Sequence, residues 1–555
     1  MEDWSSENVQ RERRENEMKR VLKTLLGENF SNLKRLLASL LVVALCMGFL
    51  VGVPKAKAQK EMFLVMAVGF KWYQLNGMTY QMEVAPEIVN GRTFVPVRFI
   101  AEAFGADVGW DPATKTVTIK SDGKTIQLTV GKTSATVDGK PYTLDAAPYI
   151  KNSRTMVPVR FISEALGLNV YYEPQKRMIY VSAKPSYAIP GVTDKEIKIG
   201  SFSALSGPLA VIGIPFYHGL QSYINWINDQ GGVNGRKIKV IVADDQMNPA
   251  LTVPAVKKFV EEDKVFAVVG GLGTPGCLAV MDYLNEKGVP FVYQGGGASA
   301  FAYPPKKYVF AVQPNYMTEG QAFVKFARQN LNTSKFALLY QNDDAGKEGA
   351  QGVQEGVKKY GGSLVYSSSF PGTETDFTSY LTRIKNSGAE VIFLYAPANT
   401  SAGANAVKAA KSLGLTQKII LPYSYAGITA MAGDAAEGVY ITGWVDFSNL
   451  NDPGVQKFFE IWGKYYPNDD PLTFSYAVAG FVAAEIFVEA LRRAGQYPTR
   501  DAIVWALETF NGWNGYVAKD ISYGPNERAG KYSLYFMTVK NKELVKISDW
   551  ISVRE

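Results

Sequence analysis

Two glycine-rich stretches, each directly after a short apolar run, are the parts of this sequence best suited to hold a ligand. The first run, residues 265–269, is followed by three glycines within residues 270–273. The second run, residues 289–293, opens into Gly-Gly-Gly-Ala-Ser at residues 295–299. In a doubly wound sheet, loops at the carboxyl ends of adjacent strands form the ligand crevice. We therefore expect an anion pocket here, although an ordinary structural turn is the alternative for either loop alone.

A predicted helix over residues 275–287 begins at the first of these loops. Thr274 followed by Pro275 is typical of an N-cap and a first helical residue. The N–H groups of a first helical turn have no partner within the helix and lie at its positive end. A carboxylate or a phosphate is the kind of group that binds there.

The acidic residues do not suggest catalysis. Two adjacent pairs, Asp244 with Asp245 and Asp343 with Asp344, stand at predicted strand ends. General acid–base chemistry uses paired carboxylates, but neighbouring side chains on an extended chain point apart. We therefore predict no catalytic residue and a protein that is not an enzyme.

Histidine and cysteine are too scarce for most metal centres. The chain has one histidine, His218, and two cysteines, Cys46 and Cys277. This composition excludes the usual zinc, copper and haem sites and makes a disulfide in the folded part improbable, while carboxylate sites for calcium remain open. We predict no metal ligand and no cofactor, and for His218 a packing or surface role on a helix.

Length and composition predict a folded protein of several domains. The 555 residues suggest two to four domains, and 47% hydrophobic with 20% charged residues is typical of a globular chain. The net charge is +7 for the whole chain and +4 beyond residue 58. So weak a positive charge does not indicate a nucleic-acid partner.

The N-terminal 58 residues have the pattern of an export signal. Lys34 and Arg35 precede an apolar run at residues 36–53, and Ala-Lys-Ala at residues 56–58 matches a cleavage site. The apolar run would span about 27 Å as a helix, so an uncleaved membrane anchor is the alternative. In either case we predict an exported, extracytoplasmic protein, at the cell surface or associated with the membrane.

Residues 59–184 contain an internal repeat. The phrase RTFVPVRFIAEAFG at residues 92–105 returns as RTMVPVRFISEALG at residues 154–167, an offset of 62 residues. Each copy predicts a short strand, a brief helix ended by glycine and further strands. Two such units can share a core that neither can bury alone.

This repeat resembles the copper amine oxidase N-terminal-like domain, whose mark is the repeated V-P-V-R-F-I-x-E-A-x-G phrase. The segment contains no histidine, so we predict neither copper binding nor amine oxidation. The resemblance implies a cell-envelope spacer or adhesion unit, and hence a contact with the cell envelope through residues 59–184. A linker at residues 185–195 is expected to follow.

From residue 196 to residue 555, predicted strands and helices alternate. This order implies right-handed crossovers and parallel sheets. The fold class predicted is α/β, in two lobes with crossings near residues 315 and 443, preceded by the small α+β repeat domain. The length of this region, which exceeds one ordinary domain, favours two lobes with a cleft between them.

This region resembles the leucine/isoleucine/valine-binding family of type I periplasmic binding proteins. The resemblance rests on IKIG at 197–200, SGP at 206–208, INDQGGVNGR at 227–236, DD at 244–245 and TDF at 375–377. It implies a receptor that captures a small solute between two lobes and delivers it to the permease and ATPase subunits of an ABC transporter. The ligand expected is a small organic carboxylate of the branched-chain amino-acid or aromatic-acid class; a surface sensor or adhesion protein with the same fold is the alternative.

The resemblance also implies a binding site. Thr274 matches a residue that binds the ligand carboxylate in the family, and Ala345 stands where members often carry an aromatic residue. The strand end at residues 421–425 lacks the acid that would pair with an ammonium group, so a zwitterionic ligand is disfavoured. Tyr293, Tyr423 and Tyr425 are suited either to stack on a planar ligand or to pack in the core. The predicted ligand-binding residues are Gly273, Thr274, Tyr293, Gly296, Gly297, Ala298, Ala345, Tyr423 and Ser424.

Overall fold

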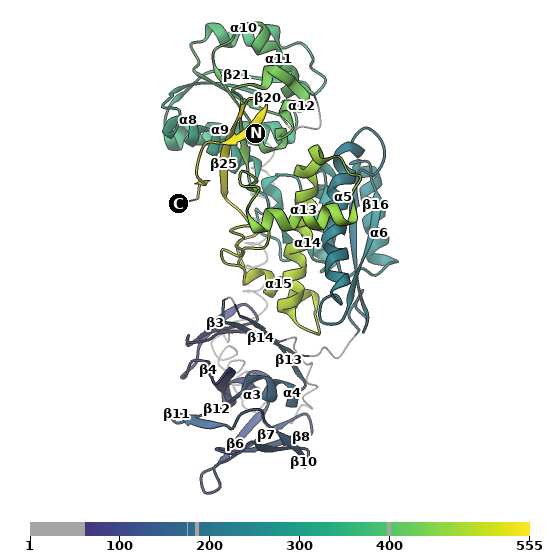
Figure 1. Cartoon of the computed structure of the whole chain (residues 1–555), viewed down its shortest axis with the longest axis vertical. Helices are drawn as coiled ribbons and strands as arrows, with labels where there is room; N and C mark the ends of the chain where they lie inside the picture. The colour runs from purple at the N-terminus through teal and green to yellow at the C-terminus, as the bar shows by residue number, and fades with distance from the viewer. Residues whose placement is uncertain (1–61, 175, 184–187, 397–400, 555) are drawn as a thin grey trace, which may run out of the picture. The chain divides into compact units, whose positions relative to one another are not determined.

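The computed structural model describes residues 62–174, 176–183, 188–396 and 401–554 (Figure 1). The predicted signal peptide or anchor at residues 1–58 lies outside the described residues. The described chain consists of a small antiparallel domain and a larger region with two mainly parallel sheets, which confirms the predicted fold class. We refer to residues 62–183 as the repeat domain.

The repeat domain is built from three antiparallel sheets and two short helices. Its sheets have the strand orders β13-β14-β1-β2-β3, β10-β9-β8-β7-β6 and β11-β12-β5-β4. The elements are β1 (Phe63–Ala67), β2 (Trp72–Leu75), β3 (Met78–Gln81), β4 (Glu87–Val89), β5 (Arg92–Pro96), α3 (Val97–Ala103), β6 (Asp107–Asp111), β7 (Thr116–Ser121), β8 (Lys124–Thr129), β9 (Ser134–Val137), β10 (Lys140–Thr143), β11 (Tyr149–Lys151), β12 (Arg154–Pro158), α4 (Val159–Ala165), β13 (Leu168–Glu173) and β14 (Met178–Ala183).

The two copies of the repeat meet at one pair of equivalent residues. Strands β5 and β12 pair antiparallel with Val95 opposite Val157, two positions that are 62 residues apart like the repeat itself. Both valines are fully buried and belong to one hydrophobic cluster drawn from both copies. The copies therefore share a core, as the repeat predicts.

The first lobe surrounds a five-stranded parallel sheet of order β16-β15-β17-β18-β19. Its elements are β15 (Glu196–Ser203), α5 (Ala210–Asp229), β16 (Lys237–Asp244), α6 (Pro249–Glu261), β17 (Ala267–Leu272), α7 (Thr274–Glu286), β18 (Phe291–Gly295), η2 (Ser299–Phe301), β19 (Val309–Phe310), α13 (Pro453–Tyr465), η5 (Pro471–Thr473), α14 (Phe474–Ala494) and α15 (Arg500–Glu508).

The second lobe surrounds a sheet that is parallel from β21 to β24 and ends in antiparallel strands. The order is β21-β20-β22-β23-β24-β25-β26, with β27 paired to β25. Its elements are α8 (Tyr316–Gln329), β20 (Lys335–Gln341), α9 (Asp344–Tyr360), β21 (Ser363–Phe370), α10 (Thr378–Asn386), β22 (Val391–Tyr395), α11 (Ala402–Ser412), β23 (Lys418–Leu421), η3 (Tyr423–Tyr425), α12 (Ile428–Ala432), η4 (Gly433–Ala436), β24 (Tyr440–Gly443), β25 (Ser533–Lys540), β26 (Glu543–Lys546) and β27 (Ile551–Ser552).

The chain passes between the two lobes three times. It leaves the first sheet after β19 and enters the second lobe with α8, whose N-cap Asn315 accepts a hydrogen bond from the N–H of Thr318 at 2.7 Å. It returns after β24 to form α13 to α15 on the first lobe, and then crosses again to β25. The sequence suggested only the first two passages, because β25 follows a long segment without helix–strand alternation.

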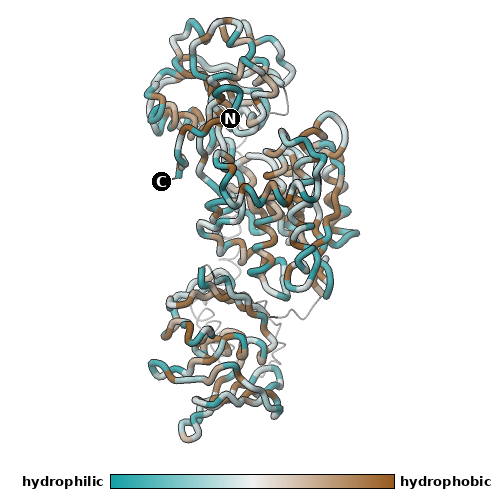
Figure 2. The backbone as a smooth tube through the Cα atoms, in the orientation of Figure 1, coloured by the Kyte–Doolittle hydropathy of each residue, from teal (hydrophilic) through white to brown (hydrophobic). Residues whose placement is uncertain are grey.

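Helix α14 is the central helix of the first lobe. Among the described residues it is the one helix long and apolar enough to cross a membrane, but 78% of its most apolar window is buried inside the protein. It packs against α5 so closely that a side chain at Gly219 or Gly480 would clash with the backbone of the other helix. Figure 2 shows hydrophobic residues along the inner strands and helices and hydrophilic residues at the outer turns. The burial of α14 and its close packing against α5 identify it as a core helix.

The repeat domain and the first lobe share one buried cluster. Phe63, Val65 and Tyr180 belong to the same cluster as the side chains of α14 and α15. The hydroxyl of Ser182 donates to the carbonyl of Ala494 on α14 at 3.2 Å. The repeat domain is therefore packed onto the first lobe.

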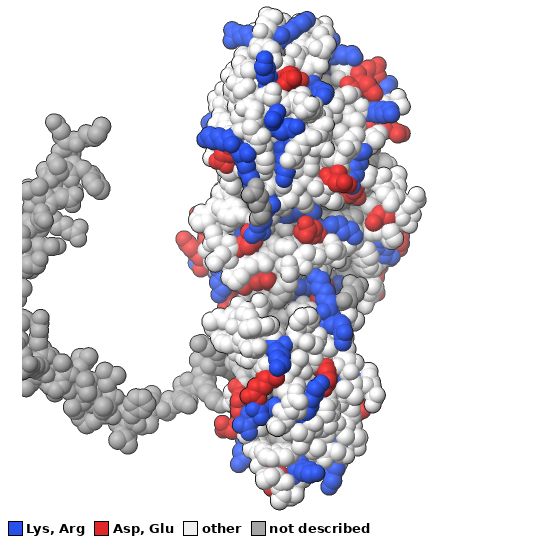
Figure 3. Space-filling model, turned by 90° about the vertical axis from the view of Figure 1, so that its left-hand side faces the viewer, with Lys and Arg blue, Asp and Glu red and all other residues white. Residues whose placement is uncertain are grey.

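Surface charge is mixed. On the face shown in Figure 3, Lys and Arg side chains alternate with Asp and Glu over the described residues. Exposed pairs such as Arg98 with Glu102 (3.8 Å) and Lys464 with Asp229 (3.0 Å) contribute to this pattern. Mixed charge agrees with the small net charge of the region beyond residue 58.

Candidate functional site

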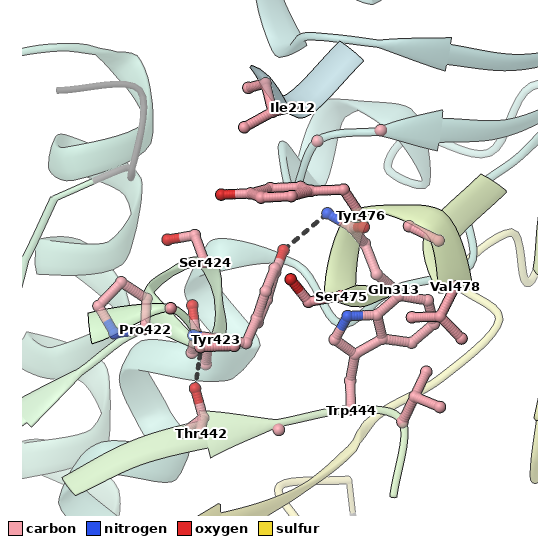
Figure 4. A pocket seen from close by; sticks show the side chains of 18 of the residues that line it. Ile212, Gln313, Pro422, Tyr423, Ser424, Thr442, Trp444, Ser475, Tyr476 and Val478 are labelled. Carbon is pink, nitrogen blue, oxygen red and sulfur yellow. Dashed lines mark hydrogen bonds between the residues drawn. The ribbon is translucent and has the colours of Figure 1, made fainter. Parts of the chain in front are cut away.

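A cavity of about 570 Å³ lies between the two lobes, at the carboxyl ends of both sheets. The loops after β17 and β18 form one wall, and those after β20, β22, β23 and β24 form the other. Helices α5 and α14 add apolar side chains. Figure 4 shows the rings of Tyr423, Trp444 and Tyr476 around this space. Such a cavity, mostly apolar with a few polar groups, is typical of a small-molecule site.

Thr274 lies in this cavity, but it does not cap the helix. The N-cap of α7 is Gly273, with φ 105° and ψ 118°, and Thr274 is the first helical residue. The N-cap prediction is therefore wrong: glycine tolerates the positive φ that turns the chain from β17 into α7, which moves the helix start one residue earlier. The Thr274 hydroxyl is 3.0 Å from the hydroxyl of Tyr316.

The second glycine loop is packed tightly against its neighbours. A side chain at Gly296 would clash with the Thr274 hydroxyl, and one at Gly297 with the ring of Tyr316. The carbonyl of Gly297 accepts a hydrogen bond from the Tyr316 N–H at 2.7 Å. Gly296 lines the cavity, whereas Gly297 and Ala298 lie behind the wall, Ala298 in the hydrophobic core of the first lobe.

On the second lobe, Ala345, Tyr423 and Ser424 all line the cavity. Ala345 is in the first turn of α9, after Asp343, whose side chain caps this helix by accepting from the Gly346 N–H at 2.8 Å. The hydroxyl of Tyr423 accepts a hydrogen bond from Nε2 of Gln313 at 2.7 Å (Figure 4).

Tyr293 and Tyr425 are both completely buried. Tyr293 borders the cavity, but its ring packs against Phe216 and Trp444, and its hydroxyl donates to Oε1 of Gln313 at 2.8 Å. Tyr425 lies outside the cavity lining, where its hydroxyl accepts from the Gly403 N–H at 3.0 Å. Tyr425 is therefore a core residue, and Tyr293 presents no free ring face.

Of the nine predicted site residues, seven border one cavity: Gly273, Thr274, Tyr293, Gly296, Ala345, Tyr423 and Ser424. Their role in ligand binding stays a prediction.

The adjacent acidic pairs have separate structural roles. Asp244 accepts from the Ser206 hydroxyl and from the Leu205 N–H, and these bonds hold its pKa below the usual value. Asp245 is buried, which raises its pKa, and it accepts from the Thr252 hydroxyl at 2.6 Å. On the other pair, Asp343 caps α9 and Asp344 stands exposed at the edge of the cavity.

A further acid, Glu319 in the first turn of α8, was missed by the sequence reasoning. It borders the cavity, is completely buried, and burial raises its pKa to about 7. Oε2 accepts from the Tyr395 hydroxyl at 2.6 Å, and Oε1 accepts from the Tyr423 N–H at 2.8 Å and from the Thr442 hydroxyl. The sequence has no spacing signal for this residue, because its partners are 76 to 123 positions away.

Much of the apolar wall was also missed. Trp444 and Phe447 follow β24, Tyr476 and Val478 belong to α14, and Phe216 to α5. Trp444 stands directly after the strand end at Gly443, which is the one positional signal that sequence reasoning had available.

His218 has a packing role in this structure. Its ring stacks on Tyr466 with centroids 3.8 Å apart, and Nδ1 lies 2.8 Å from a carboxylate oxygen of Asp469. The Trp462 indole donates to the same carboxylate at 3.0 Å. Within the described residues, no group of three or more His, Cys, Asp or Glu side chains is arranged to hold a metal ion.

Two family profiles match the chain. The periplasmic binding protein family matches residues 196–543, and the copper amine oxidase N-terminal domain matches residues 74–181. Both family resemblances drawn from the sequence are thereby confirmed.

Individual relatives and structures agree with these profiles. "Leu/Ile/Val-binding protein homolog 7" of Brucella abortus (strain 2308) is 25% identical over 337 residues, which are 58% of this chain and 82% of that protein. A branched-chain amino acid ABC transporter protein of Thermus thermophilus with bound valine has a TM-score of 0.59 at 23% identity, covering 65% of this chain and 98% of its own. A fatty acid ABC transporter substrate-binding protein of Thermomonospora curvata has a TM-score of 0.58 at 23% identity, covering 67% and 96%.

Proposed function

Because the chain belongs to the periplasmic binding protein family, we propose that it is the extracytoplasmic receptor of an ABC transporter and binds a small organic carboxylate between its lobes. The observation that carries this proposal is the cavity between the two sheets, with the start of α7 on one side and an aromatic wall on the other. Lobe closure around such a ligand is a common mode of capture.

The carboxylate end of the ligand is expected beside Thr274 and Tyr316. Their hydroxyls lie 3.0 Å apart and both border the cavity. One carboxylate can accept from both hydroxyls, and the positive N-terminal end of the α7 dipole favours a negative charge there. Charge-assisted hydrogen bonds of this kind are stronger than those between neutral groups.

The rest of the ligand is expected to be apolar and flat or branched. Trp444, Phe447 and Tyr476 offer aromatic surface, and Ala345 leaves room where a larger residue would fill the space. A volume of about 570 Å³ falls in the range of cavities that enclose drug-sized ligands. These features support an aromatic acid, or another acid with an apolar body, over a compact polar solute.

An ammonium group on the ligand lacks a good partner. The side chain of Glu319 is enclosed by three hydrogen-bond donors of the protein itself and has no exposed surface. Of the other acids that border the cavity in the described structure, Asp343 accepts hydrogen bonds from the Gly346 N–H and the Gln341 side chain, whereas Asp344 and Glu543 are exposed to water. Burying an unpaired charge is costly, so we expect the ligand to carry a carboxylate without an ammonium group.

The named relatives support carboxylate as the shared chemistry. Valine is bound to the Thermus thermophilus protein, and the Thermomonospora curvata protein is described as a fatty acid receptor. Valine and a fatty acid share a carboxylate and an apolar body, and they differ in the ammonium group. The proposed receptor function also implies partners. We expect the permease and ATPase subunits of an ABC transporter, and a contact with the cell envelope through residues 59–184.

A thermal-shift screen tests this function. The purified protein is heated with 3-phenylpropanoate, 4-methylpentanoate and the corresponding primary amides. A ligand present at 100 times its Kd stabilises the native state by about 2.7 kcal/mol, so the acids are expected to raise Tm and the amides are not. Equal shifts with acids and amides, or none with any carboxylate, would exclude the proposed ligand class.

A further inference from the structure

The carboxylate of Glu319 is hydrogen-bonded to residues at the ends of three strands. Tyr395 is the last residue of β22, Tyr423 follows β23, and Thr442 is the residue before the last in β24. These strands are neighbours in the second sheet. Each of the three residues donates one hydrogen bond to the carboxylate of Glu319, which comes from the first turn of α8.

The same group of residues forms the second-lobe wall of the cavity. The backbone N–H of Tyr423 is held by Glu319, and its hydroxyl receives the Gln313 amide at 2.7 Å (Figure 4). Gln313 in turn accepts the hydroxyl of Tyr293 on the first lobe at 2.8 Å. A continuous chain of hydrogen bonds therefore runs from β18 through the first crossing to Glu319.

Because these groups are buried, the arrangement of the three strand ends depends on the Glu319 carboxylate that accepts their hydrogen bonds. Glu319 is completely buried, and so are the side chains of Tyr395 and Thr442. A buried donor that loses its acceptor cannot turn to water and pays the full desolvation cost. Removing the acceptor is therefore expected to shift the strand ends rather than leave them in place.

We infer that Glu319 is a positioning residue of the binding site: it fixes the ends of β22, β23 and β24 in the arrangement that receives the ligand, without touching the ligand itself. This inference rests on the proposed function, because the site it orders is the one proposed to bind the carboxylate. It assigns to an acid bordering the cavity a role other than pairing with a ligand ammonium group.

The test compares Glu319→Leu with Glu319→Gln and with a matched control, Glu485→Leu. Leucine removes both acceptor oxygens, whereas glutamine keeps one acceptor and an NH₂ group that the Tyr395 hydroxyl can accept. Glu485 on α14 is also completely buried and accepts from the N–H groups of Tyr516 and Ala518, but it does not line the cavity. The control therefore measures the loss of a buried glutamate away from the site.

Calorimetric titration with 3-phenylpropanoate gives the first readout. Glu319→Leu is expected to bind at least roughly tenfold more weakly, the effect of about one strong hydrogen bond. Glu319→Gln is expected to restore affinity to within roughly threefold of the wild type. Glu485→Leu is expected to lower Tm but to leave the Kd of the folded protein within roughly twofold.

Hydrogen exchange without ligand gives a second readout that does not depend on the proposed function. In Glu319→Leu, the Tyr423 amide is expected to exchange faster, because its acceptor is gone; in Glu485→Leu, faster exchange is expected at Tyr516 and Ala518 instead. If Glu319→Leu does not fold, Tyr395→Phe and Thr442→Val each remove one donor, and both are expected to weaken binding while leaving the Tyr423 amide protected.

Two results would overturn the inference. One is unchanged affinity together with unchanged protection of Tyr423 in Glu319→Leu. The other is an equal loss of affinity in Glu319→Leu and Glu485→Leu, since that would reflect stability alone. Failure of the wild type to bind the probe would count against the proposed ligand class, and the exchange result would then decide the role of Glu319 by itself.

Discussion

Arg493 of helix α14 and Glu173 of the repeat domain form a buried ion pair, with Nη2 and Oε2 3.3 Å apart. The Arg493 side chain has no exposed surface and that of Glu173 only 10%. Arg493 also donates to Glu489 at 2.8 Å and to the Thr509 hydroxyl at 2.9 Å, and its guanidinium lies over the ring of Phe510. This arginine therefore connects the repeat domain with two helices of the first lobe.

Arg493→Met is expected to destabilise the protein by about 3–5 kcal/mol, because it leaves the buried Glu173 without its ion-pair partner and Glu489 with the longer 3.8 Å contact to Arg492. Urea unfolding followed by fluorescence measures this change. Lys464→Met is the control, since Lys464 and Asp229 are both more than half exposed, and the loss of such a pair costs at most about 1 kcal/mol. Equal, small effects in both variants would show that the two domains are not joined through Arg493.

Tyr423→Phe and Tyr425→Phe form a matched pair that separates the site from the core. The first removes the acceptor of the Gln313 amide at the cavity, and the second removes the acceptor of the Gly403 N–H in the core. We expect Tyr423→Phe to weaken ligand binding by roughly three- to tenfold, and Tyr425→Phe to lower stability by about 1 kcal/mol without changing affinity. Calorimetry and thermal unfolding of both variants provide the comparison. A reversed pattern would place the ligand elsewhere.

Asp344→Asn tests whether the ligand carries an ammonium group. If it does not, removing the exposed carboxylate at the cavity edge leaves affinity for 3-phenylpropanoate unchanged or higher, because one negative charge near an anion is lost. Asp343→Ala is the neighbouring control: it removes the cap of α9 and is expected to cost about 1 kcal/mol of stability. A large loss of affinity for leucine in Asp344→Asn, with the affinity for 3-phenylpropanoate unchanged, would mean that Asp344 pairs with an ammonium group on the ligand.

Stability is expected to fall as pH rises from about 5 to 8, in part through Glu319 and Glu485. Burial raises the pKa of each to about 7, so between the unfolded value near 4.5 and about pH 7 the native state binds more protons than the unfolded state. By linkage, stability then decreases with rising pH. In Glu485→Gln the decrease should be smaller by roughly 2–4 kcal/mol, as measured by urea unfolding at pH 5 and pH 8. The same decrease in unfolding free energy between pH 5 and pH 8 in Glu485→Gln and in the wild type would contradict the raised pKa of Glu485.

The alternation of helices and strands, and the repeat, were predictable because they rest on local patterns. Val95 and Val157 pair as the 62-residue offset suggests, and the two glycine loops meet at one cavity because adjacent parallel strands end at the same edge. The N-cap of α7 was misjudged by one residue, because Gly273 adopts a positive φ that the sequence does not reveal.

The second-lobe wall could not be predicted in this way. Tyr423 and Tyr425 are two residues apart and equally aromatic, yet one lines the cavity and the other is in the core. Their difference arises from the short η3 turn and from partners far away in the sequence, Glu319 and Gly403. Contacts of this kind depend on tertiary packing.

The most direct test of the proposed ligand is a calorimetric comparison of matched pairs: 3-phenylpropanoate with phenylalanine, and 4-methylpentanoate with leucine. Each pair differs only in the α-ammonium group. We predict tighter binding of the acid without the ammonium in at least one pair, and a roughly 10- to 100-fold loss of that affinity in Thr274→Val, which removes one donor to the carboxylate. Tighter binding of leucine and phenylalanine than of their deaminated analogues, with unaltered affinity in Thr274→Val, would contradict the account.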